Sequence, residues 1–167
     1  MMVEQRGRIP IGGRTSAFLA VSTVQELRVV ADRFGQRRFG AIVRIALRRL
    51  VSAPPDDLVE RLAARRGWST EQPPTPLWLG PDLRAELDVL AGASDGVVSE
   101  LIRFGCDALL LELATARLNG AEIDLTDAVH EEMFRGSDPN RAELIRRRER
   151  KEARRRSEER SRRSRAK

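Results

Sequence analysis

The feature that most constrains the fold is one order of elements that occurs twice, a short apolar strand followed by two amphipathic helices. In the clearer copy, TPLWLGPDLRAELDVL leads through a turn into VVSELIRFGCDALL. In the earlier copy, RTSAFLAVST leads into VQELRVVADRF, and FGAIVRIALRRLV follows a glycine-containing turn. Leu27 aligns with Leu87 at an offset of 60, and Arg44 aligns with Arg103 at an offset of 59. A unit this short cannot bury its own faces, so each copy needs a partner.

Both copies resemble ribbon-helix-helix modules, the small DNA-binding fold whose strands pair into an antiparallel ribbon that enters the major groove. The second copy matches better, because SELIR, a small residue (Gly105) and then Leu109 and Leu110 resemble the second-helix pattern of the family. The resemblance implies a mainly α fold with short β-strands, built as two tandem ribbon-helix-helix-like repeats plus a basic C-terminal helix or disordered tail. The strands can pair within one chain or between two chains, and the sequence leaves both possibilities open.

Changes in composition divide the chain into six segments. Gly7, Pro10 and scattered arginines predict a flexible basic arm, and three prolines within Gln72–Pro76 mark a boundary between the copies. The expected segments are the arm (1–13), repeat 1 (14–51), a linker with a short helix (52–74), repeat 2 with an extended last helix (75–118), an acidic connector (119–136) and an Arg-rich charged tail (137–167).

The net charge of +6 is distributed unevenly. Residues 1–72 hold 13 arginines against 7 acids, and residues 73–136 hold 4 arginines against 12 acids. Residues 137–167 hold 14 lysines and arginines against 6 acids. A polyanion is therefore attracted to the first block and the tail, while the second copy repels it.

The strands are the expected base-reading elements. In the second strand, inward Leu77 and Leu79 would leave Pro74, Pro76 and Trp78 outward, and none of these makes a bidentate contact with a base. In the first strand, the sequence leaves open which set of alternate residues faces the core. If Leu19 and Val21 face inward, then Ser16, Phe18 and Ala20 face outward; otherwise Thr15, Ala17 and Leu19 do. The polar candidates for base contacts are Arg14, Thr15 and Ser16.

Phosphate contacts are expected at the start of the second helix of each copy, where backbone N–H groups and the helix dipole favour an anion. In the first copy, Arg37 and Arg38 next to Gly40 predict a phosphate clamp, with a solvated basic loop as the alternative. Arg44 is a further phosphate candidate, although solvation with local ion pairing is the simpler interpretation. In the second copy, Asp95 opposes a phosphate.

One capping signal and the basic tail complete the expected elements. Thr23 with Glu26 forms a capping-box pattern that starts the first helix near Val24. The tail predicts nonspecific nucleic-acid binding with a steep salt dependence, as either a charged helix or a partly disordered arm. Its candidate residues are Arg146, Arg147, Arg148, Arg150, Lys151, Arg154, Arg155 and Arg156.

Other chemistry has little support in the sequence. His130 is the only histidine and stands among acids, no metal-ligand spacing occurs, and no phosphate-binding glycine-rich loop follows a strand. We therefore expect no enzyme activity and no cofactor. The one cysteine, Cys106, is an expected core residue and favours a cytoplasmic location. No uncharged apolar run reaches the roughly 18 residues of a membrane span, so we expect no membrane partner.

The sequence predicts double-stranded DNA as the partner, bound by the first copy and the basic arms, with the second copy used for assembly into an oligomer or with a protein partner. The resemblance implies a transcriptional regulator or a plasmid or conjugation accessory factor. The alternative is an antitoxin-like adaptor or scaffold whose basic tail binds nucleic acid nonspecifically.

Overall fold

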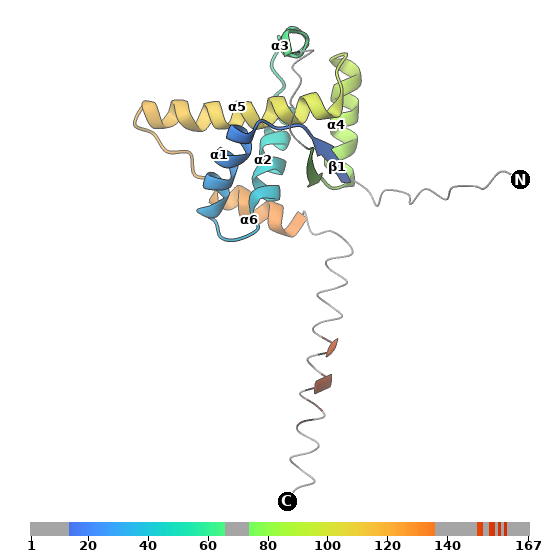
Figure 1. The fold of residues 1–167 in the computed structure, drawn as a ribbon, viewed down its shortest axis with the longest axis vertical. Helices are drawn as coiled ribbons and strands as arrows, with labels where there is room; N and C mark the ends of the chain where they lie inside the picture. Colours follow the sequence, from blue (N-terminus) through green and yellow to red (C-terminus); the bar gives the residue numbers. More distant parts are fainter. Residues whose placement is uncertain are drawn as a thin grey trace, which may run out of the picture. The chain divides into compact units, whose positions relative to one another are not determined.

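The structure, a computed structural model, describes residues 14–65 and 74–135 and, nearer the C-terminus, residues 150, 151, 154, 155, 157 and 159 (Figure 1). The chain divides into two compact units, Met1–Gly136 and Ser137–Lys167. The expected arm 1–13, part of the linker and most of the tail lie outside the described residues.

The first unit is mainly helical. Its described elements are β1 (Arg14–Ala17), α1 (Val21–Asp32), α2 (Phe39–Ser52), α3 (Leu58–Arg65), β2 (Thr75–Trp78), α4 (Pro81–Ala93), α5 (Val98–Leu118) and α6 (Thr126–Arg135). None of the described helices is long and apolar enough to cross a membrane.

The two strands pair with each other in an antiparallel ribbon within the one chain. Thr15 lies opposite Leu77, and Ser16 lies opposite Pro76. Opposed residues of an antiparallel pair share a face of the sheet. Because Leu77 is only 6 % exposed, the face that holds Thr15 and Leu77 covers the core, and the face that holds Ser16 and Pro76 points away from it.

The core lies where α2 packs on α5. Apolar residues occupy most of the circumference of α2, which makes it the most buried helix of the described part; its buried positions are Ala41, Ile42, Val43, Ile45, Ala46, Leu47 and Leu50. The two helices approach closely at Gly105, where a Cβ atom would lie 3.0 Å from the Leu47 side chain. Cys106 is fully buried beside this contact, as expected of a core residue.

The expected division into two tandem repeats is wrong. The described residues 14–65 and 74–135 hold a single sheet, to which each half contributes one strand, and one continuous core shared by both halves. The linker and the acidic connector are also part of that core, because α3 buries Leu58 and Leu62, Leu125 is buried just before α6, and α6 buries Val129. One short strand-helix-helix unit is too small to cover its own apolar faces, and here the rest of the first unit covers them.

The predicted start of the first helix is also wrong. The helix begins at Val21, its N-cap is Ala20, and no side chain caps it. Thr23 lies inside the helix and is buried, and its hydroxyl donates a hydrogen bond to the Asp107 carboxylate on α5 at 3.2 Å. A residue type that favours caps is used here as a link between two helices.

Candidate nucleic-acid interface

Burial decides which strand residues face outward. Ala17 and Leu19 are buried, so Ser16 and Phe18 point away from the core, and both are exposed. Thr15 is half-buried on the core face, which leaves it poorly placed for a base contact. The backbone of Arg14 pairs with Trp78 at the end of the ribbon, whereas its side chain lies outside the described residues. Ser16 is therefore the base candidate with a described outward side chain.

The first turn of α2 lies next to the end of the ribbon, and Arg44 joins them. One terminal nitrogen of its guanidinium donates to the Trp78 backbone carbonyl at 3.1 Å. The same nitrogen would lie 3.2 Å from a Cβ atom built on Gly40. The guanidinium also lies over the Trp78 ring, 5.7 Å from its centroid. Gly40, at the start of α2, is thus within one side chain's reach of the Arg14–Trp78 pair.

In this structure Arg44 is paired with other groups of the protein, and its role as a phosphate contact stays a prediction. Its side chain is only 11 % exposed, and its Nε donates to the Glu132 carboxylate on α6 at 3.0 Å. Arg48, one turn further along α2, donates to the same carboxylate. The simpler interpretation of Arg44, a solvated side chain with a local ion pair, is wrong. The side chain is mostly buried, and the acid that it shares with Arg48 lies more than 80 residues away in the sequence. Both arginines link α2 to α6 in the structure.

The start of α2 holds two arginines, of which Arg37 is exposed and Arg38 is partly buried. Arg37 is exposed and has a φ of 64°, in the left-handed region that side chains with a Cβ atom avoid. Arg38 is the N-cap residue, no side chain caps the helix, and no acid lies in its first turn. The Nε of Arg38 is buried without a hydrogen-bond partner. The first N–H groups of a helix lack intrahelical acceptors, so this end presents N–H groups and positive charge together.

Arg28 belongs to the same surface, and the sequence interpretation missed it. From α1 its guanidinium lies over the Phe39 ring, 6.0 Å from the centroid, at the first residue of α2. The spacing within α1 carries no signal for this contact, because Arg28 is simply one of the exposed positions of an amphipathic helix. We call Arg28, Arg37, Arg38 and Gly40 the α2-start cluster.

The start of α5 has the opposite chemistry. The residue that adopts a left-handed conformation in the turn before α5 is an acid, Asp95, with a φ of 50°. The Glu100 carboxylate accepts a hydrogen bond from the Val97 backbone N–H at 3.3 Å, as in a capping box. The Ser94 hydroxyl donates to the Leu90 carbonyl at 2.6 Å. Carboxylates thus occupy the end of α5 where a phosphate would bind, in keeping with the acidic second half.

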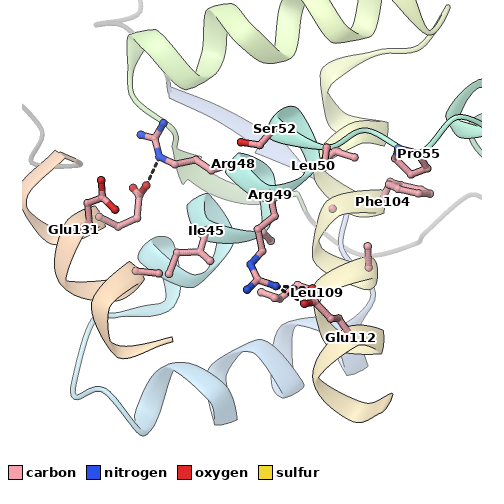
Figure 2. Close-up of a pocket in the computed structure, with 16 residues that line it drawn as sticks. Ile45, Arg48, Arg49, Leu50, Ser52, Pro55, Phe104, Leu109, Glu112 and Glu131 are labelled. Atoms are coloured by element: carbon pink, nitrogen blue, oxygen red, sulfur yellow. Dashed lines mark hydrogen bonds and ion pairs between the residues drawn. The ribbon is translucent and has the colours of Figure 1, made fainter. Parts of the chain in front are cut away.

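A cavity of about 640 Å³ lies between α2, α5 and α6. Its floor is apolar and includes Ile45, Phe104 and Leu109. Figure 2 shows Arg49 reaching from α2 towards Glu112 on α5, and Arg48 reaching towards α6. One terminal nitrogen of Arg49 donates to both carboxylate oxygens of Glu112, at 2.6 Å each, and the two side chains are about half exposed. Ion pairs therefore border an apolar hollow.

The tail candidates are only partly described. Arg150, Lys151, Arg154 and Arg155 are helical and exposed. The remaining tail candidates, Arg146, Arg147, Arg148 and Arg156, lie outside the described residues or have undescribed side chains.

Groups that could perform other chemistry are few in the described part of the chain. Within it, no set of three or more His, Cys, Asp or Glu side chains is grouped so as to hold a metal ion. His130 is exposed on α6. Burial, assisted by the neighbouring Asp107 charge, raises the pKa of the Cys106 thiol to about 12, so the thiol stays protonated at neutral pH.

Comparisons with known proteins identify no relative. No protein-family model, no curated protein and no solved structure matches the chain.

Proposed function

We propose that this protein binds double-stranded DNA through the α2-start cluster and the outer face of β1, as a ribbon-helix-helix-related transcriptional regulator or plasmid or conjugation accessory factor in the cytoplasm. The observation that carries the proposal is Arg37, an exposed arginine in a left-handed conformation at the uncapped start of α2. A strained backbone conformation at such a position is a reason to suspect a function.

Two further observations support a DNA site at this end. Arg38 has an unpaired buried Nε beside Arg37, and Arg28 approaches the first residue of α2 from the neighbouring helix. Gly40 lies next to the end of the ribbon, so a duplex that meets the outward Ser16 also reaches the N–H groups of α2. These positions provide phosphate contacts that orient the duplex. Ser16 alone offers little base readout, so affinity rests mainly on charge.

Salt titration tests the proposal. We expect the full chain to bind a random 20-base-pair duplex at 50 mM salt and to lose affinity steeply by 200 mM. Reversal of both Arg37 and Arg38 to Glu lowers affinity and flattens the salt slope by about 2 units, close to 0.9 for each lost phosphate contact. Reversal of both Arg61 on α3 and Arg84 on α4 to Glu changes the net charge by the same amount and is the matched control. No binding of the full chain at 50 mM salt contradicts DNA binding.

A chain that ends at Arg135 isolates the contribution of the tail. We expect it to bind more weakly than the full chain but to keep its dependence on Arg37 and Arg38. Equal losses on reversal in both chains would show that the tail and the α2-start cluster contribute independently. Loss of all binding on truncation would instead assign DNA binding to the tail alone.

The adaptor alternative has its own observation. The second half of α5 is apolar on several faces, yet Leu111 is 68 % exposed and Leu118 is 87 % exposed. A helix that is apolar all round is normally covered, and exposed apolar patches mark interaction sites. For this alternative, Leu111→Glu with Leu118→Glu would abolish assembly or capture of a partner without changing DNA affinity.

A further inference from the structure

One carboxylate fixes α6 at the proposed DNA site. The buried positions of α6 and of the residue before it are Leu125, Val129 and Glu132, spaced as one helical stripe. Two members of this stripe are apolar, and the third is a carboxylate that is only 3 % exposed. Its charge is compensated by Arg44 and Arg48 of α2.

Both arginines belong by position to the proposed interface. Arg44 lies one turn after Gly40 and touches the end of the ribbon at Trp78. Arg48 follows on the same face of α2 and is about a quarter exposed. The two guanidinium groups share this one carboxylate. The planar fork of arginine binds phosphate as well as it binds carboxylate.

We infer that α6 is a releasable latch, in which Glu132 withholds Arg44 and Arg48 from nucleic acid and a bound duplex displaces it. The inference rests on the proposed function. An approaching phosphate offers Arg44 and Arg48 a new anionic partner. It also repels the exposed acids Asp127 and Glu131 on the same helix.

The structure of α6 suits release. It spans only the ten residues Thr126–Arg135, and short helices that are held by few buried side chains open at low cost in free energy. Ala128, Glu131 and Glu132 form one wall of the 640 Å³ cavity. Detachment therefore exposes two arginines at the interface and opens the apolar floor of the cavity to solvent.

Neutralisation of Glu132 separates the release of α6 from the general effect of removing one negative charge. Glu132→Gln removes the carboxylate, and Glu131→Gln removes an equal charge from the exposed neighbouring position. With a random 20-base-pair duplex, the latch predicts that Glu132→Gln raises affinity about tenfold more than Glu131→Gln does. The salt slope should be the same for the two variants, because the duplex displaces Glu132 in the unmodified chain as well and the bound state makes the same phosphate contacts in each. Equal gains in affinity for the two variants overturn the latch.

Hydrogen exchange on the unmodified full chain gives a second measurement that does not depend on how Glu132→Gln folds. On addition of the duplex, amides in α6 should exchange at least tenfold faster while those in α4 stay unchanged. Protection of α6 that stays constant or increases overturns the latch and leaves DNA binding standing. Failure of the unmodified chain to bind the duplex at 50 mM salt overturns both proposals together.

Discussion

Replacement of Arg37 by glycine separates the stability of the fold from its proposed function. Arg37 has a φ of 64°, a conformation that costs a residue with a Cβ atom about 1–2 kcal/mol. Glycine removes this cost but gives the unfolded chain more conformational freedom, worth roughly 0.5–1 kcal/mol. The net expectation for Arg37→Gly is a gain of about 0.5–1 kcal/mol in the free energy of unfolding, or a rise of about 1–4 °C in Tm.

The same substitution removes a charged donor from the α2-start cluster. A hydrogen bond to a charged group contributes about 1.5–3 kcal/mol, so affinity for a duplex should fall about 10- to 100-fold at 50 mM salt. The salt slope should decrease by about 0.9, the value for one phosphate contact. Urea unfolding and fluorescence titration of one preparation of Arg37→Gly measure both quantities, and opposite signs are expected.

Two controls sharpen this prediction. Asp95→Gly relieves the corresponding left-handed conformation before α5 and removes no positive charge, so it should not weaken DNA binding. Arg37→Lys keeps both the charge and the backbone strain and should retain most of the salt slope. The reasoning is refuted if Arg37→Gly destabilises the protein by more than about 1 kcal/mol, or if its affinity equals that of the unmodified chain.

Two further predictions concern the core. The Cys106 thiol, with its pKa raised from 9.0 to about 12 by burial, stays protonated in the folded state at pH values where the unfolded chain loses the proton. The free energy of unfolding should therefore fall by about 3 kcal/mol between pH 9 and pH 12. The chain has no tyrosine to titrate in that window, and a Cys106→Ala variant that showed the same decline would contradict this assignment. Gly105→Ala should cost about 1–3 kcal/mol, because the new Cβ would lie 3.0 Å from Leu47. Gly92→Ala, on α4 with nothing within 4 Å of the new Cβ, should stabilise the protein by about 0.5–1 kcal/mol. Thermal unfolding measures both variants, and a change of Tm in the same direction for the two would contradict this reasoning.

Local pattern was sufficient for much of the fold. Alternation in the second strand predicted that Leu77 and Leu79 face the core, and both are buried. In the first strand, alternation left open which face is inward, because apolar residues occupy both sides of SAFLA. Only the burial of Ala17 and Leu19 decided between the two faces. The capping pattern at Thr23 misled, since the hydroxyl bonds to Asp107, 84 residues away.

At the proposed site, too, local sequence signals predicted some residues and missed others. The turn that holds Arg37 and Arg38 was found from the sequence, because glycine and adjacent arginines before an apolar helix are a local signal. The role of Arg44 was not, because its partner Glu132 lies on a helix whose amphipathic pattern ends in a buried acid. A buried carboxylate is predictable only when the cations that compensate it are known to be near.

By itself, the sequence of this protein determined the order of strands and helices, the apolar faces and the uneven distribution of charge, because each of these depends on residues close together in the chain. Only the tertiary structure decided that the two strands pair with each other and that the connectors complete one core. It also decided that Arg44 is paired while Arg37 stays exposed. Pairing and burial depend on which distant side chains share a space from which water is excluded, and no local spacing specifies that space.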